Sequence, residues 1–249
     1  MTSALPFAAL RCRDFLWRHP EFPVLLLSAG AWLFLLAEPF ARAGAPMGHQ
    51  GHGDVMLPSP DNWPALLSDW FIMLAAMMFP SLVPQVRLVA MRSFWSRRQR
   101  AITLFLAGYS VVWVLYAVLA ELVLAGLQRT WSPLLRFVVP LGLLLAAVWQ
   151  LTPQKRRSLV ACHFTMPLAP AGWRADLDCS QYGIKTAWHC LVSCWALMLI
   201  CAVAGHALWA MFVVTLVVLS ERVVRRPRRL SFAAALFCAV LAVAWQFWP

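Results

Sequence analysis

Long apolar runs separated by short basic clusters constrain the fold of this chain more than any other feature. Six of seven such runs are close to the roughly twenty residues that a helix needs to cross the hydrocarbon core of a membrane. They do not alternate between apolar and polar residues, as the strands of a membrane barrel do. Only 12% of the 249 residues are charged, about half the fraction of a soluble domain. The sequence therefore predicts an all-α, polytopic membrane helix bundle that forms one integral membrane domain over residues 1–249.

Seven transmembrane helices are predicted from these runs. They cover residues 22–40, 65–89, 101–127, 132–151, 186–204, 206–219 and 230–247. The sixth run is too short for a full crossing, so it is either a short helix or one whose preceding turn lies earlier than Gly205-His206. Ala41-Arg42-Ala43 also resembles the cleavage site of a signal peptide, and cleavage there would leave six helices. Residues 152–185 are predicted to be a long polar connection.

The basic residues indicate how the helices are oriented. Four segments (the N-terminus, 87–100, 152–185 and 221–229) hold 18 of the 21 Lys and Arg residues, and with seven spans all four fall on one side. The positive-inside rule then places the N-terminus in the cytoplasm and the C-terminus in the periplasm of a cell inner membrane. Because the basic residues form short clusters between apolar runs, the net charge of +11 indicates contact with a lipid bilayer and no nucleic acid.

The fifth apolar run carries a stripe of soft metal donors. Cys190, Cys194, Met198 and Cys201 follow at i, i+4, i+8 and i+11, which places them on one face of a helix. Thiolates and thioethers together suit Cu(I), and thiolates alone suit zinc. The alternative is that these residues only pack, because free cysteine behaves as a small hydrophobic side chain.

The second apolar run carries a similar face. Asp69, Met73 and Met77 are each four residues apart, and Pro80 and Pro84 are expected to bend the helix just beyond them. These methionines either bind a soft metal together with the stripe on the fifth run or serve as adaptable packing. The first alternative requires that the two helices are neighbours.

Two loops carry further candidate ligands. His49 and His52 lie in a glycine-rich loop on the predicted outer side, where imidazoles can capture copper or another transition metal. Cys162 and His163 lie in the polar connection, and that connection can fold back toward Cys190. Each loop can equally be a plain polar segment without a metal.

Several segments together resemble a bacterial family of predicted metal-binding integral membrane proteins of uncharacterised function. The matching motifs are Trp70…Met73-Leu74-Ala75-Ala76-Met77-Met78-Phe79-Pro80, Gly108-Tyr109…Trp113, Gln150-Leu151-Thr152-Pro153…Lys155…Cys162, Gly183…Cys190…Cys194-Trp195-Ala196-Leu197-Met198 and Glu221-Arg222. They extend from the second apolar run to the sixth. The resemblance implies metal binding.

Three positions depart from the pattern of that family. Ser158 and Ser193 stand where relatives usually carry cysteines, and His163 stands where they usually carry arginine. The loss of two thiols weakens a tetrathiolate zinc site in particular. The mixed site that remains would consist of Cys162, His163, Cys190 and Cys194.

The sequence therefore predicts an inner-membrane protein that binds or handles a transition metal, with copper favoured over zinc. It would act as a binding or delivery component and not as an enzyme, together with another membrane or periplasmic metal-handling protein. Two alternatives stay open. One is a secondary transporter that uses Glu38, Asp69 and Glu121, since carboxylates within a membrane are costly. The other is a structural subunit of a membrane complex in which the sulfur side chains only pack.

Overall fold

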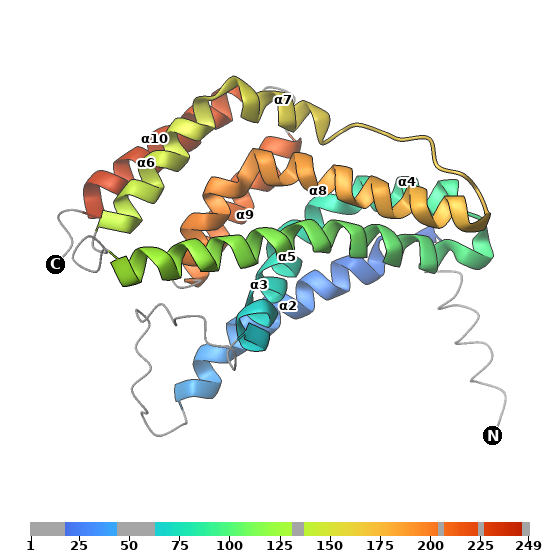
Figure 1. The fold of residues 1–249 in the computed structure, drawn as a ribbon, viewed down its shortest axis with the longest axis horizontal. Coiled ribbons are helices and arrows are strands. Elements are labelled where there is room, and N and C mark those ends of the chain that lie inside the picture. Colours follow the sequence, from blue (N-terminus) through green and yellow to red (C-terminus); the bar gives the residue numbers. More distant parts are fainter. Residues whose placement is uncertain (1–17, 44–62, 131–136, 204–206, 224–226, 246–249) are drawn as a thin grey trace.

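The computed structural model of the chain describes residues 18–43, 63–130, 137–203, 207–223 and 227–245, and these parts contain helices and no strand (Figure 1). The α-helices are α2 (Phe22–Ala43), α3 (Trp63–Met78), α4 (Val83–Arg92), α5 (Arg98–Thr130), α6 (Val138–Leu151), α7 (Pro153–Ala161), α8 (Gly172–Val203), α9 (Leu208–Val223) and α10 (Pro227–Trp245). Two short 3₁₀ helices, η1 (Phe79–Leu82) and η2 (Trp95–Arg97), lie between them. The all-α prediction is confirmed for the described residues.

Three helical stretches are long and apolar enough to cross a membrane. They are Trp63–Arg92, Trp95–Leu127 and Gly172–Val203. Shorter apolar helices cover Phe22–Ala37, Val138–Leu151 and Leu230–Val243. These three stretches correspond to the second, third and fifth of the seven predicted crossings, and the full set of seven stays a prediction.

The polar connection predicted over residues 152–185 is mostly helical, so this prediction was wrong. Helix α7 begins after Thr152, whose side chain accepts a hydrogen bond from the Lys155 amide at 3.3 Å. Helix α8 begins at Gly172, which has a positive φ of 83° that favours glycine. The polar residues from Gly172 onward form the first turns of α8, which continues into the fifth apolar run.

The bend predicted at Pro80 is confirmed. Helix α3 ends at Met78, the 3₁₀ helix η1 follows, and α4 begins at Val83. Pro80 and Pro84 each occupy the beginning of their helix, where the missing amide hydrogen costs no hydrogen bond. The break ends α3 in the middle of the molecule, beside α8.

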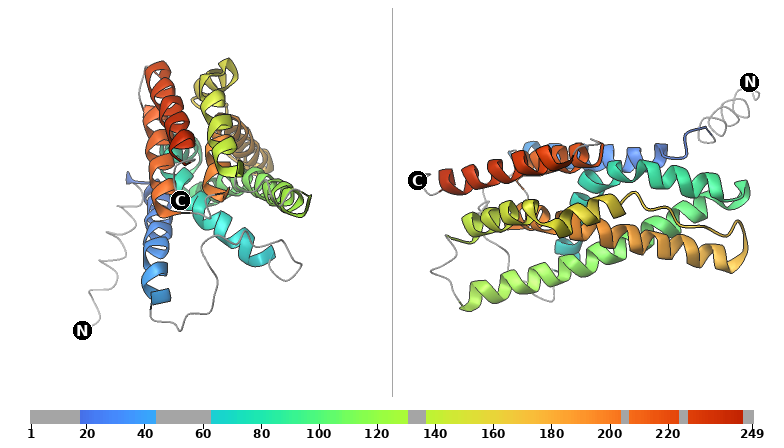
Figure 2. Two further views of the ribbon diagram at one scale, coloured as in Figure 1. Left: turned by 90° about the vertical axis from the view of Figure 1, so that its left-hand side faces the viewer. Right: turned by 90° about the horizontal axis from the view of Figure 1, so that it is seen from above.

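Helices α5 and α8 lie side by side along the long axis and form the centre of the fold (Figures 1 and 2). Two glycines let them approach closely. A Cβ atom on Gly108 would clash with the backbone oxygen of Ser180, and one on Gly183 would clash with the backbone oxygen of Phe105. Small residues at such crossings are typical of helix pairs in membranes. At the other end of the molecule, α6 packs along α10 (Figure 1).

Replacing Gly183 by alanine is expected to destabilise the α5–α8 pair. The new methyl group would meet backbone atoms that cannot move aside, and we expect a loss of about 1–3 kcal/mol in the free energy of unfolding. Thermal unfolding of the purified chain in detergent measures this. The matched control is Gly142→Ala on α6, because a Cβ there meets nothing within 4 Å. Equal melting temperatures for Gly183→Ala and the unmodified chain would contradict the expectation.

Ion pairs fasten the helices near the α7–α8 connection. Arg97 at the end of η2 and Arg100 at the beginning of α5 both pair with Asp176 on α8, the latter with 2.7 Å between Nη2 and Oδ2. Glu21, just before α2, accepts from Arg87 on α4 at 2.6 Å. The Arg87 guanidinium lowers the pKa of the Glu21 carboxyl. These contacts tie α4 to the segment before α2, and the beginning of α8 to η2 and α5.

Candidate metal centre

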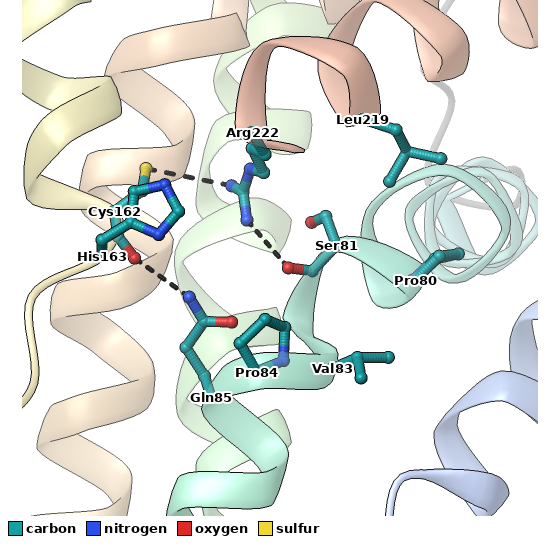
Figure 3. Close-up of a pocket in the computed structure, with 9 residues that line it drawn as sticks. All are labelled: Pro80, Ser81, Val83, Pro84, Gln85, Cys162, His163, Leu219 and Arg222. Carbon is teal, nitrogen blue, oxygen red and sulfur yellow. Dashed lines mark hydrogen bonds between the residues drawn. The ribbon is translucent and has the colours of Figure 1, made fainter. Parts of the chain in front are cut away.

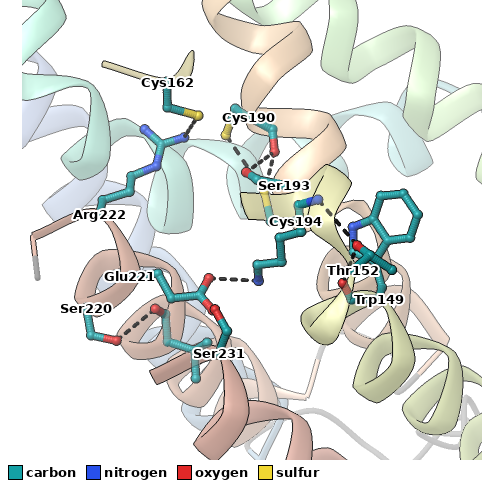
Figure 4. A network of polar contacts seen from close by, with 12 residues as sticks. Trp149, Thr152, Cys162, Cys190, Ser193, Cys194, Ser220, Glu221, Arg222 and Ser231 are labelled. Carbon is teal, nitrogen blue, oxygen red and sulfur yellow. Dashed lines mark hydrogen bonds and ion pairs between the residues drawn. The ribbon is translucent and has the colours of Figure 1, made fainter. Parts of the chain in front are cut away.

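Three sulfur side chains meet where α3 ends against α8, and we refer to Met78, Cys190 and Cys194 as the sulfur cluster (Figure 4 shows both thiols). The Cys190 Sγ lies 3.8 Å from the Cys194 Sγ and 3.9 Å from the Met78 Sδ. All three residues are at most 2% exposed. The cluster is therefore held inside the protein, with Cys190 in its middle.

Local sequence explains how the three sulfurs come together. Cys190 and Cys194 are one helical turn apart on α8, so their side chains share a face. The Cys194 thiol donates to the backbone oxygen of Cys190 at 2.9 Å, which fixes its direction. Met78 reaches the pair because the proline break ends α3 at this residue. The residue that contacts Cys190 is therefore Met78, which directly follows Met77 and does not share its helix face.

Tyr109 joins the cluster from α5. Its hydroxyl donates to the Cys190 Sγ at 3.1 Å, and the residue is completely buried. The close approach of α5 and α8 at Gly108 and Gly183 brings the ring to this position. A hydrogen bond to sulfur stabilises the thiolate over the thiol, because it places positive charge beside the anion.

Arg222, in the last turn of α9, brings a positive charge to the cluster (Figures 3 and 4). Its Nη1 donates to the backbone oxygen of Ser81 at 3.2 Å, and its Nη2 lies 3.9 Å from the Cys162 Sγ. A fixed guanidinium next to thiols favours their ionised, metal-binding form.

Cys162 lies at the edge of the cluster, directly after α7. Its backbone oxygen accepts from the Gln85 side chain at 3.0 Å, and the residue is buried. Burial raises the pKa of the Cys162 thiol to about 11, although the nearby Arg222 guanidinium opposes this shift. Cys162 is therefore a protonated thiol at neutral pH as long as no metal displaces the proton.

A buried ion pair between Lys155 and Glu221 lies beside the thiols. Lys155 Nζ on α7 is 2.8 Å from Glu221 Oε2 on α9, and both side chains are at most 2% exposed. The other oxygen of Glu221 accepts from the Ser231 hydroxyl of α10 at 3.3 Å. The amide of Gln150 is also buried, and neither of its polar atoms has a hydrogen-bond partner among the residues described. The core of the protein therefore contains buried charged and polar groups as well as sulfur.

The other predicted ligands differ in how far they are buried. Met73 and Met77 on α3, and Met198 and Cys201 on α8, are buried in the core. Asp69 is exposed, and so is His163. His49 and His52 lie outside the described residues, as does the side chain of Glu38. Glu121 is buried and accepts from the Trp70 indole at 2.8 Å.

The mixed site of Cys162, His163, Cys190 and Cys194 is not assembled. Within the described parts of the chain, no group of three or more His, Cys, Asp or Glu side chains is placed to hold a metal ion. The reason is local: His163 is exposed, and the Cys162 sulfur lies against Arg222. What the structure does assemble is the thiol pair with a thioether.

Sequence reasoning missed several members of this centre as functional residues. Met78 lies five residues after Met73, off the face that the four-residue spacing defines. Lys155, Glu221 and Arg222 follow or precede apolar runs, where basic residues ordinarily mark topology. One available signal was that all four belong to the motifs of the family resemblance. The structure brings those motifs to a single place.

The donor set of the sulfur cluster fits Cu(I) better than zinc. Three donors arranged in a plane around an ion, with metal–sulfur bonds of about 2.3 Å, lie about 4.0 Å apart. The Cys190 sulfur lies at comparable distances from the other two sulfurs, 3.9 Å from Met78 and 3.8 Å from Cys194, so it can share an ion with either of them. Structural zinc requires four donors, and thioethers are ligands of soft ions such as Cu(I). The cluster therefore offers the soft sulfur donors that Cu(I) favours.

Comparison with known families supports the same metal. A model of the protein family described as "PpoB2: Copper chaperone" matches residues 67–245, a range that includes every residue of the sulfur cluster. Comparisons with curated proteins and with solved structures found no match.

Proposed function

Because the chain belongs to the PpoB2 family of copper chaperones, we propose that it binds Cu(I) at Cys190 and Cys194, with Met78 as a third donor, and passes the ion to a protein that needs it. The contact of the Cys190 sulfur with both other sulfurs carries this proposal. Cu(I) is the soft ion that thiolate and thioether ligands select, and it accepts low coordination numbers. Delivery requires no catalysis, so the chain is not an enzyme.

The charges around the cluster support the binding of a monovalent cation. Lys155 and Arg222 carry positive charge and Glu221 carries negative charge, so these three residues leave one positive charge in excess. Cu(I) bound by two thiolates carries one net negative charge. The loaded centre is therefore neutral, and neutrality matters because an unbalanced charge in a buried site is costly.

The same proposal places the chain in an inner membrane with seven crossings. Three helical stretches have the required length and apolar character. Large apolar side chains such as Leu33 and Leu115 are 68% and 66% exposed, which suits contact with lipid. The distribution of Lys and Arg puts the N-terminus in the cytoplasm. A reporter that works only in the periplasm should be active when it is fused after Trp248. Activity of a reporter that works only in the cytoplasm, fused at the same place, would refute this arrangement.

The partner that receives copper is proposed to be a membrane or periplasmic copper protein. The sulfur cluster is buried, so it retains the ion until a partner or a conformational change exposes it. A secondary transporter is the less favoured alternative, because the one described acid in the core of α5, Glu121, is paired with the Trp70 indole.

The test is loading of the purified chain with Cu(I) under anaerobic, reducing conditions, followed by X-ray absorption at the copper edge. We expect about one copper per chain with sulfur as the only type of ligand. Met78→Leu keeps the volume of the side chain and removes the thioether, so it should reduce the sulfur count and weaken binding without unfolding the chain. Copper bound mainly by nitrogen or oxygen, or no copper at all, would refute the proposal.

A further inference from the structure

A cavity of about 250 Å³ opens where η1, α4, the end of α7 and α9 meet (Figure 3). Its lining includes Pro80, Ser81, Gln85, Cys162, His163 and Arg222. It is smaller than the cavities of about 300–1,000 Å³ that hold drug-sized ligands. Its size therefore suits a small ligand and excludes a folded protein domain.

Polar groups in this cavity have unused hydrogen-bonding capacity. Gln85 is 6% exposed and donates its amide nitrogen to the Cys162 backbone, but its side-chain oxygen has no partner among the described residues. The Nε of Arg222 is likewise buried without a partner there. Buried polar atoms of this kind are usually satisfied, so their exceptions mark places where a ligand or solvent binds.

Cys162 and Arg222 connect the cavity with the sulfur cluster. Both residues line the cavity. The Cys162 Sγ lies 3.9 Å from the Arg222 Nη2, and Figure 4 shows both residues near Cys190 and Ser193. Met78, Cys190 and Cys194 do not line the cavity, so an ion in it meets the Cys162 sulfur first.

We propose that this cavity receives Cu(I) as a complex with a small thiol, and that Cys162 is the first sulfur of the protein to take the ion before it moves to Cys190 and Cys194. The proposal rests on the function proposed above. Arg222 identifies the form of the cargo, because its positive charge repels a bare cation. The same charge attracts the anion that Cu(I) forms with two thiolates.

Each step is an exchange of thiols at copper, without transfer of electrons. In the first step the bond from Cu(I) to one small thiolate breaks, a bond to the Cys162 sulfur forms, and the Cys162 proton leaves with the departing thiolate. Cys190 then displaces the second small thiol in the same way. Finally Cys194 displaces Cys162, which regains a proton. The copper complex keeps one negative charge throughout, and Arg222 balances it.

The experiment measures how fast the full chain in detergent takes copper from the Cu(I) complex of N-acetylcysteine. Rapid desalting at timed intervals separates chain-bound copper from the donor. For Cys162→Ser we expect a loading rate at least about tenfold lower and an unchanged final copper content. Cys179→Ser is the matched control, because Cys179 is a buried cysteine of α8 outside the cavity. Its loading rate should equal that of the unmodified chain.

A second variant keeps the test valid if Cys162→Ser does not fold. Leu219→Phe narrows the cavity without changing a thiol, and it should slow loading in the same way. Wild-type loading rates in both variants would overturn the role of the cavity. A lower final copper content in Cys162→Ser would also overturn it, because Cys162 would then be a permanent ligand. If the unmodified chain binds no copper, the proposed function itself fails, which is a distinguishable result.

Discussion

Copper binding is expected to fall to background when Cys190 and Cys194 are both replaced by serine. Serine keeps the size and the hydrogen bonds of the side chain but replaces a soft sulfur by a hard oxygen, which Cu(I) does not favour. The copper content after anaerobic loading and desalting should drop from about one ion per chain to the level of an empty control. Because the change is nearly isosteric, the fold should be retained, as circular dichroism in detergent would show.

Single variants sharpen this expectation. Cys190 contacts both Cys194 and Met78 and receives the Tyr109 hydrogen bond, whereas Cys194 contacts one sulfur. Cys190→Ser should therefore weaken binding more than Cys194→Ser. Cys179→Ser and Cys238→Ser are matched controls, since both residues are buried cysteines outside the cluster. A double variant Cys190→Ser/Cys194→Ser that keeps wild-type copper would rule out the proposed centre.

Removing one partner of the buried Lys155–Glu221 pair is expected to cause a large loss of stability. The pair is at most 2% exposed and 2.8 Å apart, so Glu221→Gln would leave the Lys155 ammonium uncompensated in the core. The usual cost of breaking a buried ion pair in this way is about 3–5 kcal/mol. Thermal or denaturant unfolding of the metal-free chain in detergent measures it.

A double variant separates the role of charge from that of packing. Lys155→Met/Glu221→Leu removes both charges and keeps similar apolar volume, and such replacements are often neutral or stabilising. It should therefore recover most of the stability that Glu221→Gln loses. Exposed pairs contribute little, so Arg100→Gln at the Arg100–Asp176 pair is the control, with Arg100 70% exposed. Equal stabilities for Glu221→Gln and this control would show that the buried pair does not stabilise the fold.

The two charged residues at the end of α9 show why the sequence could not reveal the centre in full. Glu221 and Arg222 follow an apolar run, and from sequence they are ordinary flanking charges. In the structure they face in different directions, Glu221 toward Lys155 and Arg222 toward Cys162. Their partners lie about sixty residues away in the chain, and local periodicity contains no information about such pairs.

Helix α3, the second predicted crossing, likewise could be predicted from sequence only in part. Its spacing placed Asp69, Met73 and Met77 on a common face, and its prolines predicted the bend that the structure contains. The bend determines which methionine contacts the thiols, because α3 ends at Met78 and that side chain reaches Cys190. Residue spacing fixes which side chains share a face. It does not fix where a broken helix ends relative to its neighbour.

The sequence by itself determined the helical class, the apolar runs that suit a membrane and the thiol pair on α8, because these depend on hydrophobicity and on the 3.6-residue period of one helix. Tertiary structure alone decided that Met78 and Tyr109 meet that pair, that Lys155 and Glu221 neutralise each other, and that Arg222 faces Cys162. Those contacts depend on how the helices cross, and the crossing of α5 and α8 is fixed by two glycines whose partners lie far away in the chain.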